Sequence, residues 1–162
     1  MFRRRSFLKS SSLIAGGLIL PKLSFKSKKL NQKKLKIAVV GCGGRGTGAA
    51  VQALRADNNV ELVTLADAFK DRLEASLNAI KDEFEGEMEI NIKEKNKFVG
   101  FDAYKKAIDK SDVVILASPP GFRPAHFEYA INKNKHVFME KPVATDANGV
   151  RQVLNSCLLY TS

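Results

Sequence analysis

The chain has 162 residues, 44% of them apolar, and its 27 Lys and Arg residues exceed its 17 Asp and Glu residues to give a formal net charge of +10. This length and apolar content suffice for one domain with a hydrophobic core, which excludes a wholly disordered protein. The positive charge is confined to one end. Residues 1–36 carry eleven basic residues and no acid, whereas the remainder carries sixteen basic and seventeen acidic residues, a net charge of −1. The globular part therefore gives no indication of nucleic-acid binding.

Residues 1–30 have the organisation of an export signal followed by a Lys-rich linker. The sequence Arg-Arg-Ser-Phe-Leu-Lys at residues 4–9 precedes an apolar run at residues 13–20. A charged segment before an apolar run is typical of a secretory signal, and this run is too short to cross a bilayer, which takes about 20 residues. The segment resembles the bacterial twin-arginine signal, although Arg3 stands where such signals usually have Ser or Thr.

The resemblance to this signal implies export by the twin-arginine machinery to the periplasm or cell envelope of a bacterium. Membrane contact is then expected through the signal segment alone. No clear A-x-A cleavage pattern follows the apolar run, so two fates stay open: removal of the segment, or its retention as a membrane tether.

A phosphate-binding unit is predicted after the linker. Residues 35–40 form a short apolar run that stops at glycine, as expected for a buried parallel strand. The G-x-G-x-x-G sequence of residues 41–46 leads into a helical pattern at residues 47–55, and a second strand at residues 60–66 ends at Asp67. Strand, glycines, helix, strand and acid in this order indicate a dinucleotide-binding unit.

Each glycine of this pattern has an expected role. Gly41 permits the tight turn, Gly43 lets the backbone approach a pyrophosphate, and Gly46 allows the helix to pack on the strand. We assign Gly44 and Arg45 to the same turn, where the helix N-terminus offers N–H groups to the anion.

Asp67 lies 21 residues after Gly46, where an acid accepts hydrogen bonds from the adenosine ribose. Its charge favours NAD over NADP, while Arg45 and Arg72 leave NADP open. Cys42 is interpreted as a small residue in a crowded turn. No second Cys or His stands at ligand spacing, so no metal site is predicted.

The remaining residues predict alternating helices and strands. Residues 81–97 are interpreted as an exposed helix extension and loop, with a possible short strand at residues 88–92. Helices are expected at residues 71–80, 103–110 and 123–134, and strands at residues 98–101, 112–117 and 136–139. This alternation predicts an α/β fold with a doubly wound parallel sheet over residues 31–156.

Ligands of such sheets bind beyond the carboxyl ends of the strands. Four segments fall at such ends: residues 41–46, Asp67, residues 118–121 and residues 140–142. We therefore expect them to converge on one crevice.

Four stretches of the chain resemble the Gfo/Idh/MocA family of oxidoreductases. They are residues 41–46, residues 117–120, His126, and the sequence Lys-His-Val-Phe-Met-Glu-Lys-Pro at residues 135–142. The resemblance implies a nucleotide-binding domain followed by a second α/β domain that holds most of the substrate site. It also implies an NAD(P)-dependent oxidoreductase acting on a sugar, cyclitol or similar polyol, and a homo-oligomer when complete.

By the same resemblance, Lys141 is the catalytic residue and contacts both the nicotinamide ribose and the substrate hydroxyl. Glu140 and Pro142 would shape the cofactor pocket, and Ser118 and Pro119 would line its nicotinamide side. An ammonium at this place suits proton exchange with a substrate alcohol; the alternative is a lysine that only closes a strand end. His126 is either a catalytic base or a residue that lines or caps the pocket.

The last six residues, 157–162, back-translate to a transposase end sequence used in shotgun library preparation. We therefore expect a non-native read-through tail there and a truncation before the substrate domain. Two other functions stay open: an NAD-dependent glycosidase of the same superfamily, and a non-catalytic nucleotide- or sugar-sensing protein. Lys141 favours simple redox chemistry, because the glycosidase relatives often lack that lysine.

Overall fold

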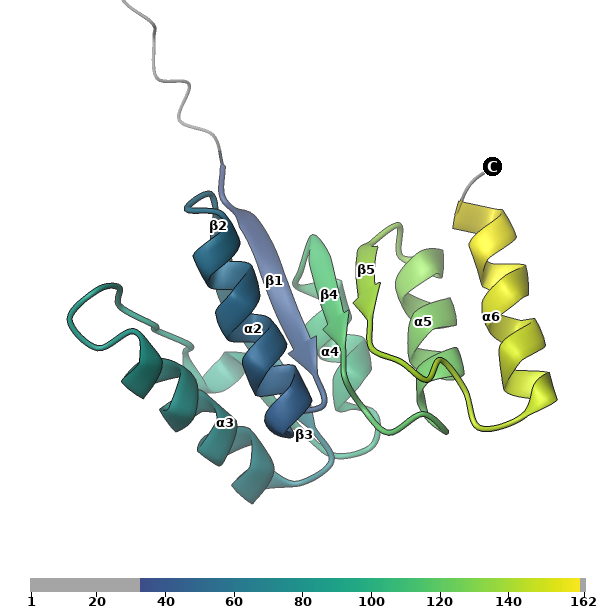
Figure 1. Cartoon of the computed structure of the whole chain (residues 1–162), viewed down its shortest axis with the longest axis horizontal. Helices are drawn as coiled ribbons and strands as arrows, with labels where there is room; N and C mark the ends of the chain where they lie inside the picture. The colour runs from purple at the N-terminus through teal and green to yellow at the C-terminus, as the bar shows by residue number, and fades with distance from the viewer. Residues whose placement is uncertain (1–32, 161–162) are drawn as a thin grey trace, which may run out of the picture. The chain divides into compact units, whose positions relative to one another are not determined.

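Five parallel strands form the sheet in residues 33–160, the part of the chain that the computed structural model describes (Figure 1). Their order across the sheet is β3-β2-β1-β4-β5, with every neighbouring pair parallel. The strands are β1 (Leu35–Val40), β2 (Val60–Asp67), β3 (Lys97–Val99), β4 (Val113–Leu116) and β5 (His136–Met139). The predicted doubly wound parallel sheet is confirmed, whereas the predicted export signal lies outside the described residues.

Helices cover both faces of this sheet (Figure 1). One face packs against α2 (Gly44–Ala56) and α3 (Lys70–Glu83), and the other packs against α4 (Ala103–Asp109) and α5 (Arg123–Asn132). A further helix, α6 (Ala147–Tyr160), packs against α5. None of the helices within residues 33–160 is long and apolar enough to cross a membrane.

The central strand β1 supplies both layers of the core. Ile37 and Val39 join the cluster under α2 and α3, while Ala38 and Val40 join the cluster under α4 and α5. Because successive side chains of a strand point to opposite faces, a strand covered on both faces must be apolar throughout. This requirement explains the unbroken apolar run that the sequence displays before Gly41.

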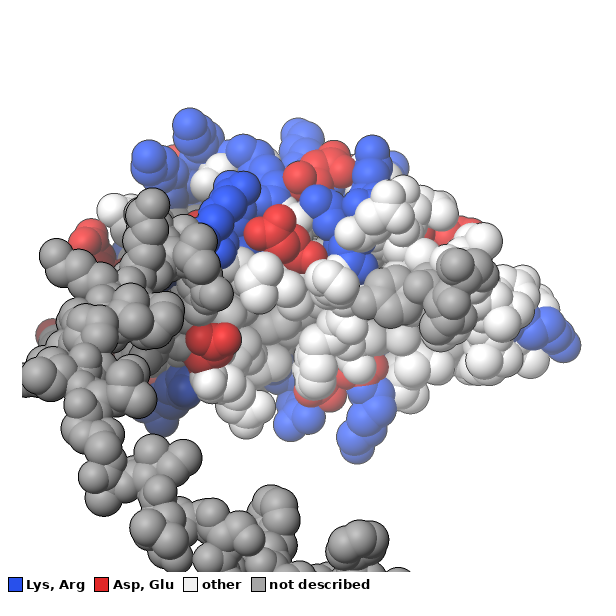
Figure 2. Space-filling view, turned by 90° about the horizontal axis from the view of Figure 1, so that it is seen from above, with Lys and Arg blue, Asp and Glu red and all other residues white. Residues whose placement is uncertain are grey.

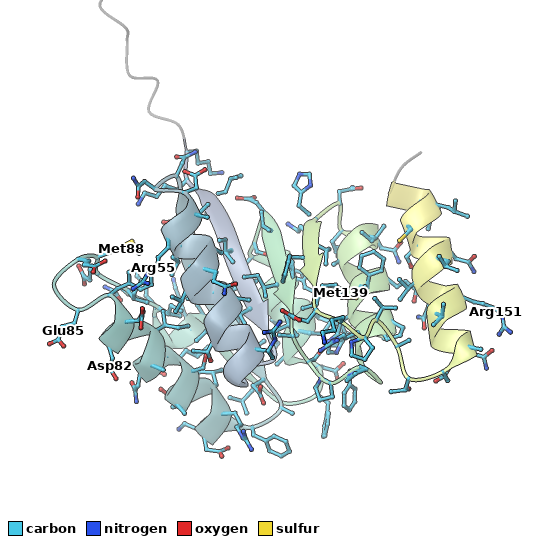
Figure 3. All side chains as sticks on the ribbon, viewed as in Figure 1. Arg55, Asp82, Glu85, Met88, Met139 and Arg151 are labelled. Atoms are coloured by element: carbon cyan, nitrogen blue, oxygen red, sulfur yellow. The ribbon has the colours of Figure 1, made fainter. Side chains whose placement is uncertain are left out.

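The predicted strand at residues 88–92 is wrong. This segment has no regular secondary structure and no strand pairing. A 3₁₀ turn at Glu94–Asn96 follows it, and β3 then occupies the sheet edge beside β2. The expected helix extension is present, since α3 continues to Glu83, but the loop is not exposed throughout, because Ile90 and Ile92 are buried with Phe84 in the core. Met88 of this loop packs against the same core cluster, whereas Figure 3 shows Glu85 pointing away from the protein.

The carboxyl ends of the strands lie together at the lower edge in Figure 1, where α2 also begins. Figure 2 views the opposite edge, and there Lys and Arg side chains are interspersed with Asp and Glu. The carboxyl edge is therefore where the segments predicted to form a site should meet.

Candidate functional site

A cavity of about 390 Å³ lies at the carboxyl ends of β1, β2 and β4. Residues that follow each of these strands line it, together with residues after β3 and in the first turn of α5. The lining includes Gly41, Gly43, Asp67, Phe69, Arg72, Gly100, Phe101, Tyr104, Ser118, Pro119, Phe122 and His126. Of the predicted site residues, the structure thus brings Gly41, Gly43, Asp67, Ser118, Pro119 and His126 into one cavity.

The turn between β1 and α2 is packed too closely for side chains at two of its glycines. Gly41 has a φ of +94°, and a Cβ there would lie 2.3 Å from the backbone nitrogen of Ser118. A Cβ at Gly46 would lie 2.0 Å from the backbone oxygen of Gly41. Gly41 therefore meets a conformational and a steric requirement, while Gly46 lets α2 approach the strand end.

Gly43 and Gly44 differ, because a Cβ at either would meet nothing within 4 Å. Gly43 is the N-cap of α2, and no side chain caps this helix end with a hydrogen bond. The first N–H groups of a helix have no partner within the helix and attract anions. The open, glycine-bounded helix end beside the cavity fits the pyrophosphate of a dinucleotide.

Asp67 connects this turn to the end of β2. Its Oδ2 accepts a hydrogen bond from the backbone N–H of Cys42 at 2.7 Å, and its Oδ1 accepts one from the backbone N–H of Phe69 at 2.9 Å. Each oxygen of a carboxylate has acceptor capacity for a second hydrogen bond. The half-buried Asp67 can therefore organise the turn and still accept from a ribose hydroxyl. Arg72 lines the same cavity as a cation.

Cys42 is buried under the turn, where its thiol contacts the Ala66 carbonyl oxygen at 3.5 Å. Burial, reinforced by the negative charge of Asp67, raises the pKa of this thiol to about 12. The residue therefore stays protonated and packs as a small apolar group. No group of three or more His, Cys, Asp or Glu residues able to hold a metal ion occurs within residues 33–160.

His126 forms part of the cavity wall on α5. Its Nδ1 lies 3.0 Å from the Ser118 hydroxyl, and its ring stacks on Tyr104 with centroids 4.1 Å apart. Burial lowers the pKa of His126 to about 4, so the ring is neutral at pH 7. This packed and hydrogen-bonded environment favours the pocket-lining role over that of a catalytic base.

The segment after β5 lies beside the cavity and does not line it. The carboxylate of buried Glu140 accepts two hydrogen bonds from Nη2 of Arg45, at 2.9 and 3.0 Å. Lys141 and Pro142, which follow it, are exposed, and a cis peptide bond joins them. Arg45 belongs to the first turn of α2, so this ion pair connects the glycine-rich turn to the residues beside Lys141. Figure 3 marks the end of β5 by Met139.

Arg123 contacts the cavity wall through Ser118, and the sequence did not identify it. Its guanidinium is buried and donates to the backbone carbonyls of Ser118, Glu140 and Pro142 at 2.6, 2.7 and 2.5 Å. Burial lowers the pKa of Arg123, and the nearby Glu140 carboxylate opposes that shift; an arginine stays protonated in proteins. The available signal was its place in the first turn of a helix, where the helix dipole disfavours a cation.

Phe101 and Tyr104 were missed as well. They follow β3 at the same edge of the sheet, and both line the cavity. Their position after β3 is a signal in the sequence, because ligands of such sheets bind beyond the carboxyl ends of the strands.

The Gfo/Idh/MocA family model, described as an oxidoreductase family with an NAD-binding Rossmann fold, matches residues 35–158. This match covers the described sheet, from the start of β1 into the last turns of α6. A comparison with curated protein sequences gives no significant match.

Solved structures resemble the chain over about four fifths of its length. A myo-inositol 2-dehydrogenase from Lactobacillus plantarum is 25% identical, with a TM-score of 0.60 over 79% of this chain and 34% of that protein. A scyllo-inositol dehydrogenase from Lactobacillus casei, solved with NAD(H) and scyllo-inositol, is 22% identical, with a TM-score of 0.62 over 80% of this chain and 34% of that protein.

The WlbA dehydrogenase from Bordetella pertussis, solved with NADH and UDP-GlcNAcA, is 21% identical, with a TM-score of 0.60 over 79% of this chain and 35% of that protein. The two comparisons below 25% identity show the fold alone. The chain spans about a third of the length of these solved relatives.

Proposed function

Because the chain belongs to the Gfo/Idh/MocA oxidoreductase family, we propose that it supplies the nucleotide-binding domain of an NAD(P)-dependent oxidoreductase. The enzyme would move a hydride between the nicotinamide and a CH–OH carbon of a sugar, cyclitol or similar polyol. The observation that carries this proposal is the cavity that joins the open helix end at Gly43 with the carboxylate of Asp67. The myo-inositol 2-dehydrogenase of similar fold, which is 25% identical, supports the substrate class.

Each part of the site has a defined task in this function. The first turn of α2 binds the pyrophosphate, and Asp67 accepts from the adenosine ribose. Ser118 and neutral His126 form part of the cavity wall on the nicotinamide side. Lys141 exchanges a proton with the substrate hydroxyl. NAD(H), when bound, supplies the hydride acceptor or donor.

The cofactor part of the proposal is tested by titrating the purified chain with NADH and with NADPH and following nucleotide fluorescence. Saturable binding, tighter for NADH, is expected because the Asp67 carboxylate repels a 2′-phosphate. If neither nucleotide binds, the proposed function is wrong.

The catalytic part is tested with a protein that also carries the substrate domain, assayed with inositols and sugars. Replacing Lys141 with Ala should reduce kcat by about 10²–10⁴, the usual contribution of general acid–base catalysis. Lys106→Ala, an exposed lysine on α4, is the control and should retain activity. A nucleotide-sensing protein would instead bind cofactor and turn nothing over in either form.

We also propose that residues 1–30 direct the folded protein to the bacterial cell envelope. The support is the arginine pair before the apolar run. A folded reporter fused to residues 1–36 should be exported. A variant in which both Arg4 and Arg5 are replaced by Lys should remain in the cytoplasm. Export of both forms would contradict the twin-arginine route. A homo-oligomeric state of the complete protein stays a prediction, to be measured by light scattering.

A further inference from the structure

Arg123 holds the backbone on both sides of Lys141. Its Nη1 donates to the carbonyl oxygens of Glu140 and Pro142, the two residues that flank this lysine. Its Nε donates to the carbonyl oxygen of Ser118, which lines the cavity after β4. One side chain therefore joins the cavity wall to the peptide that carries the exposed lysine.

Burial of the Arg123 guanidinium is unfavourable unless all of its hydrogen-bond partners are present. Arg123 is 5% exposed, and it occupies the first position of α5, where the positive end of the helix dipole opposes a cation. Burying a charge is destabilising unless the charge is paired and hydrogen-bonded. Here three carbonyl oxygens and the nearby Glu140 carboxylate supply that compensation.

A guanidinium suits this position better than an ammonium. Its donors lie in one plane with fixed directions, so a single group can hold several carbonyl oxygens at defined angles. The ammonium of lysine is a compact point charge on a flexible stem and does not impose such a geometry.

A second arginine restrains the same segment from the opposite side. Arg45 binds the side-chain carboxylate of Glu140, whereas Arg123 binds its backbone carbonyl. Glu140 is thereby held by residues of both α2 and α5. Lys141 follows directly, so the path of its backbone is restricted although its side chain is exposed.

We propose that Arg123 is a positioning residue that sets the place of Lys141 beside Ser118 at the cavity. It acts through the backbone of residues 140–142 and not by contact with the reacting atoms. This inference rests on the proposed function of Lys141, which it extends to the residue that orients it.

The first test needs no cofactor. Amide hydrogen exchange of Glu140, whose N–H donates to the Leu116 carbonyl oxygen at 3.0 Å, is compared between the wild-type chain, Arg123→Met and Arg123→Lys. Arg151→Met is the control, because the Arg151 side chain points outward from α6 (Figure 3). Arg123→Met should accelerate exchange of the Glu140 amide by about tenfold or more, while amides of β1 remain protected. Arg123→Lys should restore part of the protection, and the control should change nothing.

The second test is a double-mutant cycle on NADH affinity. Arg123→Met and Lys141→Ala should each weaken NADH binding by about tenfold. This is the change in the dissociation constant expected from the loss of one hydrogen bond to a charged group. If Arg123 acts through Lys141, the double variant should also be weakened about tenfold, because the second change removes nothing further.

Three outcomes would overturn the inference: unchanged exchange of the Glu140 amide, acceleration that extends equally to β1, or a double variant whose NADH binding is weakened by the full product of about a hundredfold. Failure of the proposed function is distinguished from these. If the wild-type chain binds no NADH, the proposed function fails, and the exchange experiment alone still decides whether Arg123 holds residues 140–142.

Discussion

The contact between α2 and the end of β1 gives a prediction in which one substitution has opposite effects at two glycines of the same helix. A Cβ at Gly46 would lie 2.0 Å from the backbone oxygen of Gly41, whereas a Cβ at Gly48 would meet nothing within 4 Å. Both residues belong to α2, and only Gly46 is buried. Replacing each with Ala adds the same methyl group to a collision in one case and to solvent in the other.

The two free energies follow from this geometry. Overpacking costs about 1–3 kcal/mol, and a collision with backbone lies at the upper end because no side chain can move aside. Ala also gains about 1 kcal/mol over Gly in a helix. Gly46→Ala should therefore lower the free energy of unfolding by about 2 kcal/mol, and Gly48→Ala should raise it by about 0.5–1 kcal/mol.

Thermal unfolding and urea denaturation of the purified chain measure these changes. For a domain of roughly 130 residues the unfolding entropy is about 0.27 kcal/mol per degree. Gly46→Ala should thus lower the Tm by about 7 °C, and Gly48→Ala should raise it by about 2–4 °C. In urea the two midpoints should move in opposite directions with an unchanged slope.

The close approach of α2 to the strand end is refuted if Gly46→Ala unfolds within about 2 °C of the wild-type chain. A loss at Gly48 as large as that at Gly46 would also contradict the reasoning, because helix geometry and not the collision would then set both effects.

Three further predictions concern the cavity. Gly43→Ala should lower the Tm by only a few degrees, since a Cβ there meets open space. In a fluorescence titration it should weaken NADH binding by about tenfold or more, because the methyl group blocks the place of the pyrophosphate. Asp67→Asn removes the charge that opposes a 2′-phosphate, so the NADPH-to-NADH affinity ratio should rise by about tenfold, whereas Asp71→Asn, a control on α3, should leave it unchanged. His126 has a folded-state pKa of about 4, below its ordinary value of 6.5, so its contribution to stability is complete above pH 6.5 and is lost as the pH falls towards 4. Urea denaturation should show a loss of about 2 kcal/mol between pH 7.5 and pH 5, and this loss should be absent in His126→Gln.

The sequence predicted the sheet well because the relevant signals are local. The run before Gly41 is apolar on both faces, ends at a glycine that takes a positive φ, and leads into a helix. These features fix a buried parallel strand and a tight turn without any knowledge of distant residues. The error at residues 88–92 has the same origin, because apolar alternation is the same for a paired strand and for an unpaired segment packed on the core. The segment remains unpaired because β3 occupies the sheet edge beside β2.

Residues at the ends of β1, β2 and β4 could be placed beside one cavity from the sequence, whereas the backbone contacts of Arg123 could not. Asp67 and Ser118 stand at strand ends, a position that a pattern can identify. The three partners of Arg123 are carbonyl oxygens, and every residue has one. No sequence pattern distinguishes the three carbonyls that converge on one guanidinium, since only the folded chain after β4 and β5 brings them together.

The strand order determines how a dinucleotide would lie in the proposed site. The turn after β1 is central, with the end of β2 on one side and the ends of β4 and β5 on the other. A pyrophosphate at the start of α2 therefore places one ribose towards Asp67 and the other towards Ser118 and Lys141. In the cavity lining, a carboxylate is present only on the β2 side, at Asp67. The side of β4 and β5 has the neutral ring of His126, and the buried cation of Arg123 contacts the Ser118 backbone there. The adenosine ribose then takes the acidic side, and the nicotinamide is left at the side where Arg123 holds the backbone of Lys141.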